Sequence, residues 1–304
     1  MSLARISEVS VVDLQPVRAA IAVDKVEKVF WEWKRQPFSA VPTRAFRALA
    51  PSSFSVAPGE FVSIVGPSGC GKSTLLSMIA GLSTASSGTI KVGDRKVSGT
   101  GGPDTGMVFQ SIGLFPWLTA QENVIYALAK VGRRGGPSKA EARGRALDVL
   151  KLVGLEEFKD AYANQLSGGM QQRVAIARAL VIEPILLLMD EPFGALDAQT
   201  RMVLQEELLR LRAQWEGSIL FVTHDIDEAV YLSDRVIVMA TNPGRIVEIV
   251  DIPIARPRDS LTTRADDEYI EIRSHIWRTL RPPTRRTTTA EGGAEASEKM
   301  WEEL

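Results

Sequence analysis

Short apolar runs alternate with helical repeats of apolar residues over the second half of the chain. A short apolar run predicts a strand, and apolar residues at every third or fourth position predict a helix. The expected elements are strands at 185–189, 218–222, 235–239 and 245–250, and helices at 198–215 and 226–232. This alternation predicts an α/β fold whose sheet is mostly parallel, with helices on both of its faces.

The first hundred or so residues have a β-rich pattern instead. Residues 22–30 alternate as a strand does, and 31–47 mix aromatic, basic and proline residues, which predicts a loop or a hairpin insert. Residues 61–65 form an apolar run, and 87–97 read as a hairpin that turns at Gly93-Asp94. We therefore expect a β-rich subdomain beside the main sheet.

Helical spacing dominates the middle of the chain and returns near its end. A helical subdomain is expected at about 111–180, with helices at 140–152 and 171–180, and one more helix is expected at 266–280. The predicted organisation is an N-terminal extension over 1–21, a main domain over 22–255, and a C-terminal part over 256–304. The last part combines the helix with a solvated tail rich in Pro, Thr, Gly and Glu.

Composition narrows the class of protein. The chain has 304 residues, of which 45% are hydrophobic, and its net charge of -1 gives no overall reason to bind nucleic acid. One cysteine and two histidines exclude a disulfide framework and a zinc-site spacing, which suits a reducing cytosol. Because no apolar run approaches the roughly 20 residues that span a bilayer, we expect any membrane role to be peripheral.

The most informative motif follows the apolar run at 61–65. It reads Gly66-Pro67-Ser68-Gly69-Cys70-Gly71-Lys72-Ser73-Thr74 and leads into an apolar helix, which is the pattern of a phosphate-binding P-loop. Its amide N–H groups converge on a phosphate, Lys72 reaches the β- and γ-phosphates, and the Ser73 hydroxyl can join a Mg²⁺ shell. The alternative is a glycine turn that is only structural.

Cys70 lies inside this loop, close to Lys72 and to the start of a helix. Both neighbours favour the thiolate form, so the sequence predicts a thiol that reacts with maleimides and that ATP protects. The other interpretation is a small residue that fills a loop position and has no catalytic role.

Two carboxylates end the apolar strand expected at 185–189. A buried strand that delivers acids to the edge of the sheet suits a phosphate site, with Asp190 as a Mg²⁺ ligand and Glu191 polarising the attacking water. Two acids that are merely solvated at the end of a strand are the alternative.

The segment Leu166-Ser167-Gly168-Gly169-Met170-Gln171-Gln172-Arg173 resembles the signature motif of ATP-binding-cassette ATPases. The order of motifs over about 22–250 is also similar to that family. The resemblance implies a P-loop NTPase fold, ATP and Mg²⁺ as ligands, and a second phosphate-binding site formed by Ser167, Gly168, Gly169 and Gln171. In that family, the second site closes on the γ-phosphate held by the opposite subunit. One P-loop and one signature per chain then require a head-to-tail dimer, either with an identical chain or with a paralogous ATPase.

Further roles follow from the positions that match the family. Gln110 matches the glutamine that touches Mg²⁺ and water, His224 matches the switch histidine that contacts the γ-phosphate, and Asp197 matches the acid that communicates across the dimer. Phe30 matches the aromatic residue that stacks on adenine, although Trp31 and Trp33 are also candidates. The plainer alternatives are that Gln110 is an ordinary amide at the end of a strand, that His224 is structural, and that the aromatic residue belongs to the core.

Three segments resemble the nitrate, sulfonate and taurine importer branch of the family, namely residues 115–124, 223–229 and 239–246. This resemblance implies a subunit at the cytoplasmic face of the bacterial inner membrane that drives two transmembrane permease subunits, which receive solute from an extracytoplasmic binding protein. The alternative is a cassette ATPase that acts on DNA or ribosomes. A single cassette, the lack of a long coiled coil and the neutral charge weigh against it.

The segment Phe115-Pro116-Trp117-Leu118 follows Gln110 closely. Large aromatics around a proline are either core of the helical subdomain or the wall of a groove, and aromatics are favoured as interface anchors. By resemblance to the family, we expect this segment to border the surface that receives the permease.

Overall fold

The computed structural model describes residues 20–36, 39–99, 104–131 and 137–281. Most of the predicted N-terminal extension, the basic residues 132–136 and the tail from residue 282 onward lie outside the described residues. The predicted domain boundaries at 21 and 255 remain predictions.

Among the described residues, the main sheet has six strands in the order β10-β9-β3-β8-β7-β6. All neighbouring strands pair in parallel except β10 and β9, which are antiparallel. The strands are β3 (Phe61–Val65), β6 (Thr105–Val108), β7 (Leu186–Asp190), β8 (Ser218–Thr223), β9 (Arg235–Ala240) and β10 (Arg245–Asp251). The predicted mostly parallel sheet is confirmed, and parallel strands place their carboxyl ends along one edge.

Helices cover both faces of this sheet. β3 is buried throughout, and its residues alternate between two cores: Phe61 and Val65 belong to one, and Val62 and Ile64 to the other. Helix α1 (Lys72–Ile79) packs into the second core through Leu75 and its neighbours. Helices α5 (Ala198–Gln214) and α6 (Ile226–Leu232) pack into the first core, on the opposite face.

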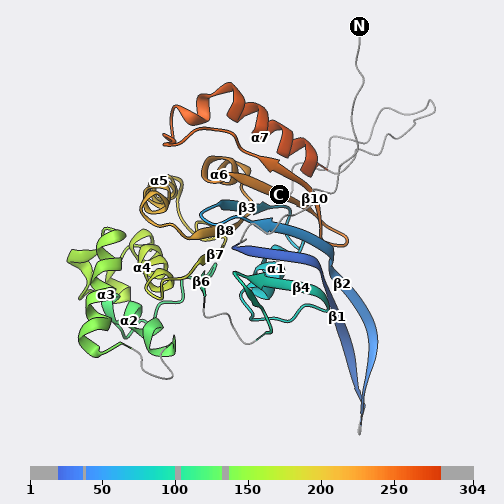
Figure 1. Ribbon diagram of the computed structural model, residues 1–304, viewed down its shortest axis with the longest axis horizontal. Coiled ribbons are helices and arrows are strands. Elements are labelled where there is room, and N and C mark those ends of the chain that lie inside the picture. Colours follow the sequence, from blue (N-terminus) through green and yellow to red (C-terminus); the bar gives the residue numbers. More distant parts are fainter. Residues whose placement is uncertain (1–19, 37–38, 100–103, 132–136, 282–304) are drawn as a thin grey trace, which may run out of the picture.

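A smaller antiparallel sheet, ordered β2-β1-β4-β5, flanks the main one (Figure 1). Strands β1 (Ile21–Gln36) and β2 (Ser39–Val56) form a hairpin that projects away from the body of the molecule. Of the two alternatives for 31–47, the hairpin is therefore correct, although residues 37–38 lie outside the described part. Strands β4 (Ser87–Val92) and β5 (Arg95–Lys96) form the second predicted hairpin, because Val92 pairs with Arg95.

The helical subdomain contains α2 (Ala120–Val131), α3 (Lys139–Leu152) and α4 (Gly168–Leu180), with short 3-10 turns at Glu156–Phe158 and Ala163–Gln165. These elements enclose a core of their own, but α4 also faces the main sheet through Ala175 and Ile176. Helix α4 includes Gly168 and Gly169 in its first turn, ahead of the helical spacing that begins at residue 171, because Ser167 caps it.

The C-terminal part packs on the main domain. Helix α7 (Asp267–Leu280), preceded by a 3-10 turn at Thr263–Ala265, lies over α6 at the top of Figure 1. It buries Tyr269 and Ile276 in the core that α5 and α6 share. Among the described residues, no helix combines the length and the apolar character needed to cross a membrane.

Candidate functional site

The P-loop forms a closed cradle between β3 and α1. Gly71 adopts the left-handed conformation, with φ of 94°, at the residue that caps α1. A Cβ atom at Gly66 would lie 2.5 Å from the carbonyl oxygen of Met239, so only glycine fits there. Pro67, Ser68 and Gly69, in the middle of the loop, are exposed.

Lys72 is buried and folds back over this loop. Its Nζ donates hydrogen bonds to the carbonyl oxygens of Gly66 at 2.7 Å and of Pro67 at 3.3 Å. Only 5% of the surface of this residue is exposed. The ammonium group is therefore held at the mouth of the cradle, where a phosphate would replace the two carbonyl oxygens as its partner.

The predicted reactivity of Cys70 is wrong. The side chain is fully buried in the core beneath α1. Burial raises the pKa of the thiol, and this effect outweighs the charge of Lys72 and the backbone N–H groups, which lower it. The thiol is thus a neutral core group, and the alternative of a small residue that fills the loop is the one that agrees with the structure.

We therefore expect Cys70 to resist maleimide labelling in the folded chain, with or without Mg-ATP. Labelling should become fast only after denaturation, because a buried, neutral thiol is a poor nucleophile. Mass spectrometry of labelled protein over time measures this directly. Rapid labelling of the native chain that Mg-ATP slows would contradict the buried position.

The adenine candidates are only partly described. Phe30 is 46% exposed and has the Nζ of Lys28 at 4.9 Å from its ring centroid, and Trp31 is 55% exposed. The side chain of Trp33 lies outside the described residues. Both described rings are thus available for stacking, and the geometry does not choose between them.

The two acids of β7 reach the carboxyl edge of the sheet beside the cradle. Asp190 Oδ1 accepts a hydrogen bond from Ser73 Oγ at 3.0 Å. Burial raises the pKa of Asp190, the charge of Glu191 raises it further, and the bond from Ser73 and the charge of Lys72 oppose both effects. A half-buried carboxylate next to a hydroxyl is an oxygen-donor pair of the kind that Mg²⁺ prefers.

Glu191 and His224 are brought together from neighbouring strands. Glu191 has φ of 43°, in the left-handed region, and its backbone N–H donates to the carbonyl oxygen of Val222. This unusual conformation turns the chain at the end of β7, and Glu191 Oε2 lies 3.1 Å from His224 Nδ1. The sequence analysis gives these two residues separate roles, whereas the structure shows their side chains in contact.

The sequence analysis missed a buried carboxylate that binds the residue before the histidine. Glu228 in α6 accepts a hydrogen bond from Thr223 Oγ1 at 2.6 Å and another from Gln205 Nε2 at 3.2 Å. Burial raises its pKa. Thr223 immediately precedes His224, and Asp225 caps α6 through the backbone N–H groups of residues 227 and 228. The position of Glu228 among the apolar residues of a short helix is the signal that could have revealed this buried acid.

Gln110 follows β6 and is exposed. In the described part of the chain, no hydrogen bond joins it to Ser73 or Asp190. Its predicted contact with Mg²⁺ and water therefore stays a prediction, although its strand pairs directly with β7, which carries Asp190.

The signature segment lies on the opposite face of the sheet from α1. Ser167 Oγ caps α4 by accepting a hydrogen bond from the backbone N–H of Met170 at 3.3 Å, and Gly168 is exposed beside it. No hydrogen bond or ion pair between described residues connects this segment with the P-loop. The exposed hydroxyl and the first amides of α4 thus form a second polar surface, separate from the cradle.

The side chain of Gln171 forms hydrogen bonds with the residues just before the helix that carries it. Its Nε2 donates to the carbonyl oxygens of Ala163 at 2.9 Å and Leu166 at 3.1 Å, which fixes the turn before Ser167. The structure therefore gives Gln171 a positioning contact, and its contact with nucleotide stays a prediction.

Asp197 lies next to the signature segment. It caps α5 by accepting a hydrogen bond from the backbone N–H of Thr200 at 3.0 Å, and this bond lowers its pKa. The side chain of Thr200 also faces Gly169, where an added Cβ would meet it at 2.9 Å. The starts of α4 and α5 therefore form one surface.

Comparison with known proteins decides the family. The family described as ABC transporter matches residues 49–194. A putative ATP-binding protein of Brucella abortus (strain 2308) is 48% identical over 232 residues, which cover 76% of this chain and 87% of the relative. The chain belongs to the ABC transporter family. It is an ABC ATPase, and the P-loop and signature are the motifs by which its sequence resembles the family.

Other similar proteins have more specific names. The bicarbonate transport ATP-binding protein CmpD of Synechocystis sp. is 43% identical over 86% of this chain and 89% of its own length. Among solved structures, the dimeric post-hydrolysis state of the ATP-binding cassette MJ0796, bound to ADP and Pi, has a TM-score of 0.64. It is 35% identical, and the match covers 77% of this chain and all of that one.

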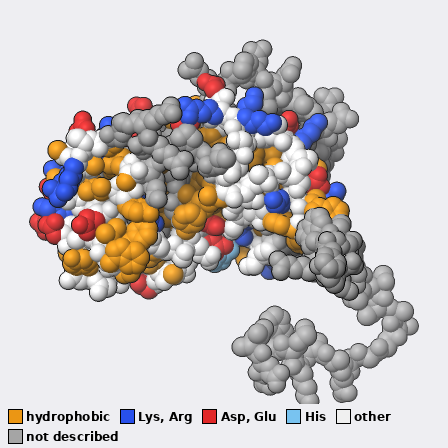
Figure 2. Space-filling view, turned by 90° about the horizontal axis from the view of Figure 1, so that it is seen from below, with side chains coloured by type: hydrophobic (Ala, Val, Ile, Leu, Met, Phe, Trp, Pro, Cys, Tyr) orange, Lys and Arg blue, Asp and Glu red, His pale blue; other side chains and the backbone are white. Residues whose placement is uncertain are grey.

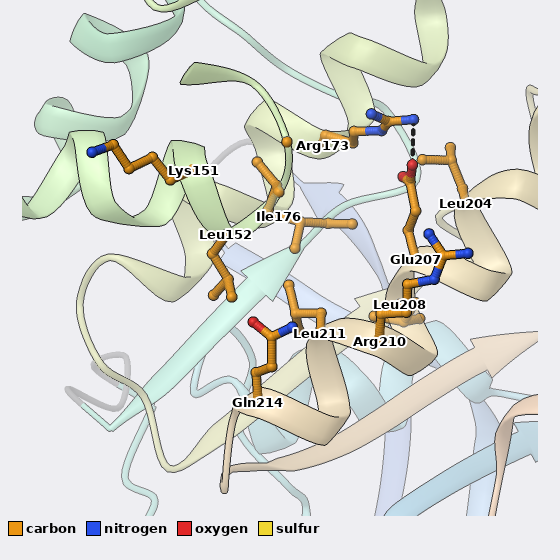
Figure 3. A pocket seen from close by; sticks show the side chains of 12 residues that line it. Lys151, Leu152, Arg173, Ile176, Leu204, Glu207, Leu208, Arg210, Leu211 and Gln214 are labelled. Carbon is orange, nitrogen blue, oxygen red and sulfur yellow. Dashed lines mark ion pairs between the residues drawn. The ribbon is translucent and has the colours of Figure 1, made fainter. Parts of the chain in front are cut away.

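The structure adds a contact between the two helices of the ABC cassette that carry Ser167 and Asp197. Arg173 of the signature motif in α4 forms an ion pair at 2.6 Å with Glu207 of α5. The pair crosses one side of a cavity of about 230 Å³ whose lining includes Ile176 and Leu208 (Figure 3). Burial raises the pKa of Glu207. The ion pair ties the signature helix to the helix that Asp197 caps.

Proposed function

We propose that this chain is the ATP-hydrolysing subunit of a bacterial ABC importer for a small anionic solute of the nitrate, sulfonate or taurine type. The similarity to the bicarbonate transport protein CmpD over nearly its whole length is the observation that carries the solute class. The nitrate import ATP-binding protein NrtC of Synechococcus elongatus, 42% identical over 84% of this chain, supports it, although the match covers only 37% of NrtC. The alternative of a DNA or ribosome ATPase has no comparable support.

In this proposal, the cradle residues from Gly66 to Thr74 bind the phosphates of ATP. The amide N–H groups and the ammonium group of Lys72 hold the β- and γ-phosphates, and Phe30 or Trp31 stacks on adenine. Ser73 and Asp190, with Gln110, would hold Mg²⁺, which neutralises charge on the phosphates when it is bound.

Glu191 then orients the attacking water, and His224 contacts the γ-phosphate. The 3.1 Å contact between these two side chains supports the assignment, because it places a carboxylate and an imidazole at the same edge of the sheet as the cradle. Thr223, which precedes the histidine, is held by its hydrogen bond to Glu228.

Two chains are needed for a complete site in this proposal. The cradle and the signature segment are separate polar surfaces of one chain, and a head-to-tail dimer in which both surfaces meet the partner lets the signature segment of one chain close on the nucleotide of the other. The dimeric state of the solved cassette supports this arrangement. The second chain is either an identical copy or a paralogous ATPase.

The helical subdomain is the proposed contact with two transmembrane permease subunits at the cytoplasmic face of the inner membrane. These receive solute from an extracytoplasmic binding protein. Trp117 is 68% exposed, so the core alternative is wrong for this residue. Its ring lies 5.5 Å from that of Phe115, which in turn lies 4.5 Å from Tyr126. Figure 2 shows hydrophobic side chains gathered over this lobe, at the left of the view.

Trp117→Ala tests the importer proposal. We expect co-purification with the permease pair to fall strongly, because a central aromatic anchor is worth about 2 kcal/mol or more at an interface. Folding and ATP binding of the isolated subunit should be retained, since the side chain is mostly exposed. Trp277→Ala is the matched control, because Trp277 is 55% exposed on α7, away from the helical lobe.

The opposite result would contradict the docking surface. If Trp117→Ala lowered thermal stability strongly and left assembly unchanged, the aromatic cluster would serve the fold of the helical subdomain. Co-purification of the unchanged chain with ribosomes or DNA in place of a permease would overturn the importer function itself.

A further inference from the structure

A second cavity lies at the opposite edge of the main sheet from the P-loop. It has a volume of about 510 Å³ and lies between α5 and the segment that follows β10. Arg212 of α5 donates there to Asp234, just before β9, and to the carbonyl oxygen of Gly59, just before β3. The cradle follows the carboxyl end of β3, so this cavity is separate from the proposed nucleotide site.

Four arginines line the cavity, and two of them share one carboxylate. Arg212 Nη2 lies 2.7 Å from Asp234 Oδ2, and Arg256 Nη2 lies 3.0 Å from Asp234 Oδ1. Their side chains are only 21% and 24% exposed. A single carboxylate therefore balances two guanidinium groups that water screens poorly.

The third guanidinium group, that of Arg258, has no carboxylate within hydrogen-bonding reach among the described residues. It is 8% exposed, and its Nη1 donates to the carbonyl oxygens of residues 230, 231 and 233 at the end of α6. Burial, together with the neighbouring charge of Arg256, lowers the pKa of Arg258 to about 10. Carbonyl dipoles compensate this charge only in part.

The two acids that line the cavity, Glu206 and Asp259, already have partners. Glu206 Oε1 accepts a hydrogen bond from Ser260 Oγ at 2.6 Å, and its other oxygen is 3.9 Å from Arg210. Asp259 Oδ1 accepts from the backbone N–H groups of residues 261 and 262. In contrast, the buried Nε of Arg212 has no hydrogen-bond partner among the described residues.

We propose that this cavity binds a small oxyanion, such as sulfate, phosphate or an organic sulfonate, between the guanidinium groups of Arg210, Arg212 and Arg256. A guanidinium group matches two oxygens of such an anion with two parallel N–H donors. The volume exceeds that of a bare ion, and Leu209 and Ala213 supply an apolar part of the lining. Space therefore remains for a short apolar group on the anion.

The test is calorimetric titration of the full chain with sulfate, phosphate and ethanesulfonate at constant ionic strength. The P-loop is first filled with Mg-ADP, so that these anions cannot bind in the cradle. We expect saturable binding with a dissociation constant on the order of 1 mM, as befits a few partly solvated charge contacts. Absence of saturable binding would overturn the proposal.

Ala213→Glu provides the decisive variant. Ala213 is exposed on α5 and lines the cavity, so a carboxylate there should replace the anion without disturbing the core. We expect sulfate binding to weaken at least about tenfold. Gln214→Glu is the matched control, because it adds the same charge one residue away, where the side chain lines the cavity of Figure 3 instead. Equal affinities in the two variants would contradict the assignment.

Arg210→Gln tests a donor directly. Arg210 is 75% exposed, so its removal should not affect folding, and sulfate affinity should fall about tenfold. Unchanged affinity in this variant, together with full binding by Ala213→Glu, would place the anion elsewhere on the molecule.

Discussion

Glu191→Gln is expected to lower the steady-state rate of ATP hydrolysis by about 100-fold or more, while ATP binding is retained. The substitution keeps the size of the side chain and removes the charge that orients water. The bond between Ser73 and Asp190 and the contacts of Lys72 do not involve Glu191, so the cradle should stay intact. An ATP-bound dimer should accumulate.

The measurements are phosphate release and the affinity for a fluorescent ATP analogue. Glu157→Gln is the control, because Glu157 is an exposed acid in the helical subdomain and should leave both quantities unchanged. Lys72→Ala should behave differently and weaken nucleotide binding itself. Near-normal hydrolysis by Glu191→Gln would remove Glu191 from its proposed role.

Ser167→Arg should abolish hydrolysis almost as completely, although no hydrogen bond or ion pair between described residues joins Ser167 to the chain's own cradle. The variant removes the exposed hydroxyl at the start of α4 and places a bulky cation where the phosphate of a second chain should bind. The isolated variant chain should still bind ATP, since α4 and α1 pack on opposite faces of the sheet.

Ser138→Arg offers a matched control. Ser138 caps α3 as Ser167 caps α4, by accepting a hydrogen bond from a backbone N–H at 3.3 Å. Loss of either cap should cost about 1 kcal/mol of stability, but only the change at Ser167 should stop hydrolysis. Equal activities of the two variants would mean that Ser167 serves the helix alone.

The P-loop, the positions of the strands from 185 onward and the acids at 190 and 191 could be predicted from the sequence, because each depends on a local pattern. A glycine-rich turn between an apolar strand and a helix is a local pattern that predicts a phosphate-binding loop. A wholly apolar strand indicates burial on both faces of the sheet. The alternation of elements from 185 onward therefore predicted β7, β8, β9 and β10 nearly to the residue.

Contacts between distant segments could not be predicted in this way. The burial of Cys70 depends on the core that β3 and β9 form beneath α1, and its neighbours in sequence indicated the opposite chemistry. The contact between Glu191 and His224 depends on the left-handed turn at Glu191, which no residue type signals. The exposure of Trp117 likewise depends on how α2 packs, which left core and surface equally open from the sequence.

The pairing of two chains is the central claim, and mixing two inactive variants tests it most directly. Glu191→Gln lacks its own water-orienting acid, and Ser167→Arg lacks a usable signature segment. In a mixed dimer, the cradle of the Ser167→Arg chain meets the intact signature segment of the Glu191→Gln chain. We predict that an equal mixture regains roughly a quarter of the unmodified activity, because half of randomly formed dimers are mixed and each has one intact site. An activity no greater than the sum of the two variants measured separately would contradict the shared site.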